Sequence, residues 1–185
     1  TISDRLLDFC IALVGRFRGG MGYVNIAVSL IFAGMSGSAV ADAAGPGKMI
    51  VSMMTKGGRY SRSYAAGITA ASAVIGPIIP PSIPMVMYAL ISDTSIGYLF
   101  LGGVGPGIFM ALMLAVMNFV LAKRGEMSRE PPVPLAEMPR RSLRALPVLL
   151  MPVILLGGIY GGAPTPPEAA AIAALYALLL AMGFY

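Results

Sequence analysis

The sequence predicts an all-α integral membrane protein that crosses the bilayer several times. Apolar residues make up 57% of the chain and charged residues only 11%, with a mean hydropathy of +0.83. A water-soluble domain could not hide so much apolar surface. Residues 99–122 hold no charge and exceed the roughly 20 residues that a helix needs to cross the hydrocarbon. Two further apolar segments are interrupted by glycine and proline, which indicates helices that break within the membrane.

Composition also excludes several classes of function. The chain has no histidine and one cysteine, which excludes a disulfide framework, a Cys/His zinc site and a histidine-based triad. An intramembrane enzyme built on Ser36 or Ser38 with Asp42 would lack a nearby histidine or lysine. The net charge is +5, but the basic residues sit at the ends of apolar runs, which is typical of cytoplasmic loops. We predict neither an enzyme nor a nucleic-acid-binding protein.

The first 20 residues predict an arm helix that lies in the membrane interface. Charged residues separate apolar ones that recur at three- and four-residue steps, which is the pattern of an amphipathic helix. The segment holds too many charges to span. The alternative is the end of a preceding spanning helix. The apolar positions are Ile2, Leu6, Phe9, Leu13 and Phe17.

Residues 21–122 are expected to form one transport region that begins with a re-entrant hairpin over residues 25–55. Glycine, serine and proline cluster in the middle of this apolar stretch and interrupt a helix there. The two arms, residues 25–33 and 48–55, are each too short to cross the bilayer alone. A hairpin that enters and leaves on one side satisfies both constraints.

The hairpin tip carries Ser36, Ser38 and Asp42 beside glycines. An ionisable residue within the membrane is functional by default, because an unpaired charge there costs several kcal/mol. In the alternative interpretation the serines bond carbonyls of their own helix and Asp42 caps the returning helix. Both interpretations can hold together.

Residues 64–91 form the second interrupted segment. Proline removes a helical donor and cannot continue a helix, so we expect two half-helices around an extended linker at membrane depth. The freed carbonyl oxygens can coordinate hard cations, an arrangement that recurs in secondary transporters. The alternative is a structural helix that is only kinked. The prolines are Pro77, Pro80, Pro81 and Pro84.

The remaining chain predicts a spanning helix at 99–122, a cytoplasmic linker at 123–144 and two further helices within 145–185. Thr165 and Glu168 predict a capping box at the start of the last helix. Basic residues occupy the loops at 56–62 and 123–144, whereas the loop at 92–98 has Asp93 and no base. By the positive-inside rule both basic loops are cytoplasmic.

These segments closely resemble, over nearly the whole chain, the large DctM-like membrane subunit of tripartite ATP-independent periplasmic (TRAP) transporters. The joint presence of two broken segments in this order is highly specific. The motifs are Arg18 to Gly20, Ser36 to Ala43, Thr69 to Ser72 leading into Ile75 to Ser82, and Thr165 to Ala171, where the family usually has threonine at the place of Pro167.

The resemblance implies an elevator-type transporter with inverted repeats, located in the bacterial inner membrane and coupled to Na⁺. It implies uptake of an organic acid such as a C4-dicarboxylate or sialic acid. The implied partners are a small membrane (Q) subunit, a periplasmic substrate-binding protein and membrane lipid. The chain would then be an interior piece that holds the first hairpin and break and opens the second repeat at residue 145. Which acid is carried is not readable from the sequence.

The resemblance also implies site residues. Na⁺ would be bound mainly through backbone oxygens of Ser36, Ser38, Gly76, Ile79 and Pro81. The substrate path would lie beside Ser36, Ser38, Asp42 and Ser82. The competing function is a channel or a structural membrane subunit without alternating access, and substrate-stimulated Na⁺ uptake separates the two.

Overall fold

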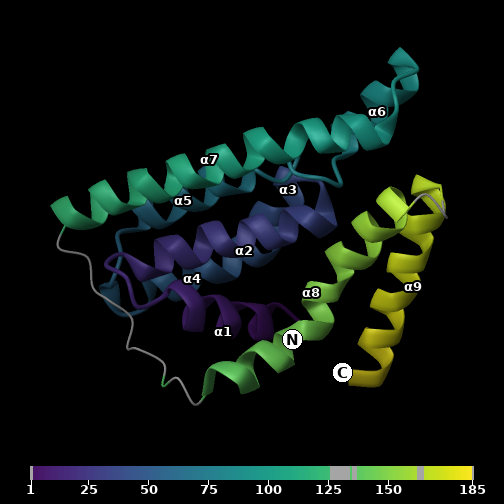
Figure 1. Ribbon diagram of the computed structural model, residues 1–185. Helices are drawn as coiled ribbons and strands as arrows, with labels where there is room; N and C mark the ends of the chain where they lie inside the picture. The colour runs from purple at the N-terminus through teal and green to yellow at the C-terminus, as the bar shows by residue number, and fades with distance from the viewer. Residues whose placement is uncertain (1, 126–133, 135–136, 162–164, 185) are drawn as a thin grey trace.

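The computed structural model describes residues 2–125, 134, 137–161 and 165–184. Throughout this part of the chain the regular elements are helices, which confirms the predicted all-α class (Figure 1). In chain order they are α1 Ile2–Val14, α2 Gly20–Ser36, α3 Ala39–Asp42, the π-helical turn η1 Ala43–Gly47, α4 Lys48–Thr55, the 3-10 turn η2 Lys56–Gly58, α5 Arg62–Ala73, α6 Ile83–Ser92, α7 Ile96–Arg124, α8 Met138–Gly161 and α9 Pro166–Phe184.

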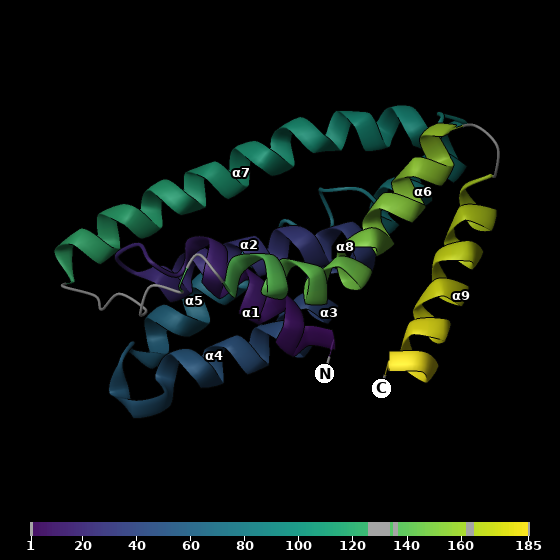
Figure 2. The same cartoon turned by 60° about the horizontal axis from the view of Figure 1, so that its bottom comes forward.

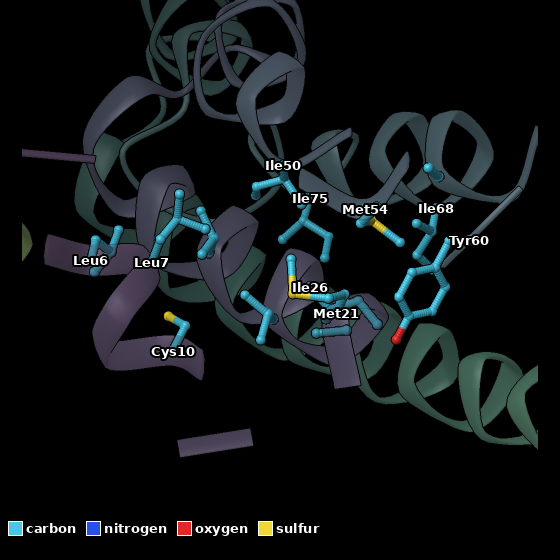
Figure 3. Packing of buried hydrophobic residues seen from close by; sticks show 14 of the residues in the cluster. Leu6, Leu7, Cys10, Met21, Ile26, Ile50, Met54, Tyr60, Ile68 and Ile75 are labelled. Carbon is cyan, nitrogen blue, oxygen red and sulfur yellow. The ribbon is translucent and has the colours of Figure 1, made fainter. Parts of the chain in front are cut away.

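The amphipathic helix α1 buries its apolar face against protein. It packs on α2 and α8, and Leu6, Leu7 and Cys10 are fully or almost fully buried. Figure 3 shows these three side chains at one end of a buried cluster that extends to Tyr60. Burial raises the pKa of the Cys10 thiol to about 12. Residues 2–14 are thus joined to the helical body, and their predicted place in the membrane interface stays a prediction.

The hairpin reverses at Gly37, which ends α2 in the left-handed conformation with φ of 60°. The chain returns through α3, η1 and α4 without a further break. The predicted arms at 25–33 and 48–55 were therefore too short, because residues 39–47 are helical. Pro46 lies inside the π-helical turn. This wider turn relieves the clash that a proline ring makes with the carbonyl one α-turn earlier.

The second segment breaks between α5 and α6, as the prolines predict. Residues 74–82 lie outside both helices, although the linker is a series of turns rather than extended chain. The amide of Gly76 donates to the Ala73 carbonyl over 3.0 Å, and the amide of Ile79 donates to the Ile75 carbonyl over 3.0 Å. Pro84 belongs to the first turn of α6, where proline is tolerated.

Within the described ranges, three helices are long and apolar enough to cross a membrane, namely α7, α8 and α9. The first contains the predicted span at 99–122 and extends beyond it at both ends. The second begins at Met138, inside the predicted linker at 123–144, so Arg140 and Arg144 lie in a helix. Most of the remaining linker is outside the described residues. At the start of α9, Glu168 accepts the amide of Thr165 over 2.7 Å, which is one of the two bonds of the predicted capping box. The Thr165 hydroxyl also donates to Glu168 over 2.7 Å, and the reciprocal bond from the Glu168 amide is not formed.

Connections between helices gather at two ends of the molecule. Figures 1 and 2 show the α4–α5 connection and the C-terminal end of α7 toward one end, and the α6–α7 connection, the last turn of α8 and the first turn of α9 toward the other. The basic α4–α5 connection and the basic end of α7 therefore lie toward one end, and the base-free α6–α7 connection lies toward the other. This separation agrees with the charge pattern, while the cytoplasmic assignment of the basic end stays a prediction.

Candidate functional site

Polar groups at the hairpin tip bond to one another across the reversal. The hydroxyl of Ser36 donates to Asp42 Oδ1 over 2.5 Å, and the amide of Ser38 donates to Ser36 Oγ over 3.3 Å. The hydroxyl oxygen of Ser38 accepts the amide of Ala41 and caps α3. The alternative in which Asp42 caps the returning helix is therefore wrong, since Ser38 has that role.

The tip and the break touch through backbone, which confirms that the two interrupted segments meet. A Cβ atom added at Gly37 would lie 2.5 Å from the carbonyl oxygen of Pro81. A Cβ atom added at Gly76 would lie 2.6 Å from Asp42 Oδ2 and 3.4 Å from the carbonyl carbon of Ser38. Both positions require glycine because any larger residue would force the segments apart.

Asp42 brings one unsatisfied carboxylate oxygen to this junction. The residue is only 3% exposed, and its Oδ2 has no hydrogen-bond partner among the described residues. A buried polar atom without a partner costs about 1–3 kcal/mol, and more if it is charged. This oxygen faces Gly76, at the start of the break, and its chemistry fits a hard cation.

The break itself contains both occupied and free carbonyl oxygens. Those of Ala73, Ile75 and Pro77 accept hydrogen bonds from nearby amides or hydroxyls. Within the described part of the chain, no hydrogen bond reaches the carbonyl oxygens of Gly76, Ile79 and Pro81. The carbonyl oxygens of Val74, Ile78 and Pro80 also accept no hydrogen bond from the described residues, so the three break residues named as ion ligands are among the free ones and are not the whole set.

Ser82 closes the linker. Its hydroxyl donates to the Pro77 carbonyl over 2.5 Å, its oxygen accepts the amide of Met85 over 3.2 Å, and the residue is 1% exposed. In this arrangement Ser82 fixes the shape of the break and caps α6. Its expected place beside the substrate stays a prediction.

An apolar cavity of about 490 Å³ adjoins the junction. Met35 and Pro81 line it together with side chains from α6, α7, α8 and α9. None of Ser36, Ser38, Asp42 and Ser82 is among its lining residues. A carboxylate needs polar partners, so this cavity does not match the predicted substrate chemistry.

Comparison with known proteins decides the family. The family model of the DctM component of the tripartite ATP-independent periplasmic transporters matches residues 1–185. The chain belongs to this family. It is similar to the sialic acid TRAP transporter large permease protein SiaM of Vibrio cholerae, at 46% identity over 185 residues. It is also similar to the C4-dicarboxylate TRAP transporter large permease protein DctM of Pseudomonas aeruginosa, at 41% identity over 184 residues.

A third relative is the 2,3-diketo-L-gulonate TRAP transporter large permease protein YiaN of Escherichia coli, at 39% identity. Each alignment covers the whole chain but only 43% of the relative. Family membership and the three apolar spans identify an integral protein of the inner membrane. The relatives are permease proteins, which agrees with the prediction that this DctM-family chain is not an enzyme.

Sequence reasoning missed a buried row of polar side chains between α2 and α5 of the DctM-family chain. Asn25 Nδ2 donates to Thr69 Oγ1 over 2.5 Å, and the hydroxyl of Ser29 donates to Ser72 Oγ over 2.9 Å. Ser72 in turn donates to Asn25 Oδ1 over 3.3 Å. The sequence did offer an indication of this row, because its polar residues recur at helical spacing within apolar segments.

Two glycines of α7 that pack against the break were also missed. A Cβ atom added at Gly103 would collide with the carbonyl oxygen of Ile78, and one at Gly107 would collide with the Ile79 side chain. These glycines are one turn apart, which is the small-residue spacing of close helix packing in membranes. In the DctM-family chain they hold the break against a regular spanning helix.

Proposed function

We propose that this chain is part of a large permease that couples Na⁺ to the uptake of an organic acid, with Na⁺ bound where the hairpin tip meets the break. The observation that carries the proposal is the unpaired Asp42 Oδ2 at the contact between tip and break, against Gly76, in a break whose carbonyl oxygens at Gly76, Ile79 and Pro81 accept no hydrogen bond from the described residues. Sodium is a hard cation, and broken membrane helices commonly supply carbonyl oxygens to it.

Ion binding at this junction provides a physical basis for coupling. Ligands from Ser36, Ser38 and Asp42 on the hairpin and from Gly76, Ile79 and Pro81 on the break would hold two separate segments together. A ligand stabilises the conformation to which it binds more tightly. Na⁺ therefore favours the conformation in which the tip and the break are closed on each other.

The charge of Asp42 sets an order of binding. A substrate carboxylate beside Ser36, Ser38 and Ser82 would be repelled by an ionised Asp42, since like charges repel strongly where water is excluded. Bound Na⁺ neutralises that charge. The ion thus binds before the acid. The Ser38 hydroxyl accepts the Ala41 amide but donates to no described group, so its hydrogen is available to a carboxylate oxygen.

The relatives' names support an acid as substrate and a tripartite assembly. They name sialic acid, C4-dicarboxylate and 2,3-diketo-L-gulonate. By this analogy the full-length protein works with a small membrane subunit and receives the acid from a periplasmic substrate-binding protein.

The test is Na⁺-dependent uptake by the full-length permease, reconstituted with its small subunit and binding protein. Gly76→Val places a β-branched side chain against Asp42 and Ser38. We expect the Na⁺ concentration at half-maximal uptake to rise about tenfold or more, which corresponds to roughly 1.4 kcal/mol of lost binding. An unchanged concentration in a well-folded variant would refute the site.

Gly67→Val is the matched control, because Gly67 lies in α5 with open space around its Cβ position. It should leave the half-maximal Na⁺ concentration unchanged. Measuring ²²Na⁺ entry with and without substrate separates a transporter from a channel. Entry that does not depend on substrate would favour the channel.

A further inference from the structure

A cavity lined by charged residues lies between α1 and the start of α8, remote in sequence from the tip and the break. Its volume is about 470 Å³. Arginines outnumber carboxylates among its lining residues, which are Arg5, Asp8, Glu137, Arg140, Arg141 and Arg144. The two helices pack against each other, so the cavity lies within a packed interface between helices.

Part of this charge is already paired within the chain. Arg141 Nη2 and Nε donate to Glu137 Oε2 over 2.9 and 3.3 Å, which neutralises one arginine and one carboxylate. Among the residues that the structure describes, Arg140 and Arg144 form no ion pair. They lie one helical turn apart on α8 and both line the cavity. Two guanidinium groups are therefore available to an anion there.

The arginines stand where α8 becomes apolar. No charged residue occurs from Ala145 to Gly161, and this stretch forms most of a candidate membrane span. Arg144 thus marks the level at which the helix leaves the hydrocarbon for the polar layer of the bilayer, where the phosphate groups of phospholipids lie.

Exposed apolar side chains continue from this level along α8. Leu146 and Leu150, on the hydrocarbon side of Arg144, are 46% and 38% exposed, and their four-residue spacing places them on one face of the helix. An anion at Arg140 and Arg144 that also carried acyl chains would have apolar surface to lie against. Free phosphate would gain nothing from these leucines.

We propose that this cavity binds the phosphate of an anionic phospholipid, with Arg140 and Arg144 as its ligands and the leucine face of α8 against its acyl chains. Guanidinium groups match phosphate oxygens with two parallel hydrogen bonds each. Basic pockets at the ends of membrane helices are recurrent sites for acidic headgroups. Bound lipid would tie the arm helix α1 to α8. This inference does not depend on the proposed Na⁺ site.

The experiment measures thermal unfolding of the purified full-length permease in detergent while phosphatidylglycerol is added. Phosphatidylglycerol should raise the melting temperature by several degrees, because a ligand that binds only the folded state stabilises it. The Arg140→Gln/Arg144→Gln variant should need at least ten times more lipid for half of that shift. Equal lipid requirements in parent and variant would overturn the proposal.

Three controls keep the result specific. Lys123→Gln/Arg124→Gln removes two positive charges from the end of α7, outside the cavity, and should keep the parent's response. Phosphatidylcholine should give a smaller shift, and inorganic phosphate alone should give none. If either probe reproduced the full shift, an anionic phospholipid would not be the ligand.

A conservative variant controls for the possibility that the glutamine variant loses lipid binding because it misfolds. Arg140→Lys/Arg144→Lys retains the charge but loses the planar fork, so its lipid requirement should fall between those of the parent and the glutamine variant. Native mass spectrometry should show phosphatidylglycerol retained by the parent and lost by the glutamine variant. Equal retention would contradict the assigned ligands.

Discussion

The junction of tip and break differs from the α2–α5 interface next to it in what makes the contact. At the junction, Gly37 meets the Pro81 backbone and Gly76 meets the Asp42 carboxylate and the Ser38 backbone, so neither glycine has room for a side chain of its own. Between α2 and α5, side chains meet instead, and Asn25, Thr69 and Ser72 satisfy one another while buried. The junction leaves polar atoms without hydrogen-bond partners, whereas the α2–α5 interface pairs its polar atoms with one another.

This difference suggests two roles: the α2–α5 interface fixes the positions of the helices, and the junction binds a ligand. A satisfied polar network between helices fixes their relative position, because the groups have no better partner in the membrane. Free carbonyl oxygens and the Asp42 carboxylate are costly unless something binds them. The α2–α5 interface lies on the same two helices whose ends carry the junction, so it can hold the unsatisfied groups in place.

Gly37 should be the most sensitive position in this comparison. Alanine there must adopt φ of 60°, which costs roughly 1–2 kcal/mol, and its Cβ would displace the Pro81 carbonyl. We expect Gly37→Ala to abolish most Na⁺-dependent uptake and to lower the melting temperature. Gly45→Ala is the control, since its Cβ position is open, and it should leave uptake close to the parent's. Equal uptake in the two variants would show that the tip does not need its close approach to the break.

Asn25 should affect stability without affecting ion affinity. Asn25→Leu removes the hydrogen bonds to Thr69 and Ser72 but keeps the branched shape of the side chain. Thr69 still donates to the Ala65 carbonyl over 2.8 Å, so part of the network survives. Side-chain hydrogen bonds between membrane helices average about 0.6 kcal/mol, and we expect a loss of about 1–2 kcal/mol in unfolding free energy. The half-maximal Na⁺ concentration should change less than twofold. A shift as large as that expected for Gly76→Val would mean that the network takes part in ion binding.

Proline and glycine made the break and the reversal predictable, because their effect on a helix is local. Residues 39–47 were predicted wrongly, since a π-helical turn absorbs Pro46 and small residues alone do not end a helix. The start of α8 was missed because Pro139 lies in its first turn, where proline is tolerated, and the neighbouring arginines suggested a loop.

For contacts between distant segments, the sequence predicted which segments would meet but not which residues would touch. The unsatisfied backbone at both breaks indicated that they would meet, but nothing in the sequence pairs Gly37 with Pro81 or Gly76 with Asp42. The partners of Asn25 and the packing of Gly103 depend on how α2, α5 and α7 are placed, and placement is a property of the whole fold.

The smallest effect is expected at Ser29. A substitution there tests whether the α2–α5 interface is a redundant network of hydrogen bonds. Ser29→Ala removes one hydrogen bond, the 2.9 Å contact with Ser72. Ser72 keeps its own acceptors, because its hydroxyl also points to Asn25 Oδ1 and to the Thr69 carbonyl over 3.2 Å.

No buried donor is therefore left without a partner in Ser29→Ala, and the loss should stay near the average of about 0.6 kcal/mol. Alanine also favours helix by up to about 0.5 kcal/mol over serine, so the measured change needs a reference. Ser52→Ala provides one, since Ser52 is an exposed helical serine on α4. The difference in unfolding free energy between the two variants isolates the hydrogen bond. When Ser29→Ala is combined with Asn25→Leu, the loss should exceed the sum of the single losses, because each variant alone leaves Ser72 a side-chain partner on α2, whereas the double variant leaves it only the Thr69 carbonyl of its own helix. Strict additivity would mean that the two bonds act independently and that the interface is not a network.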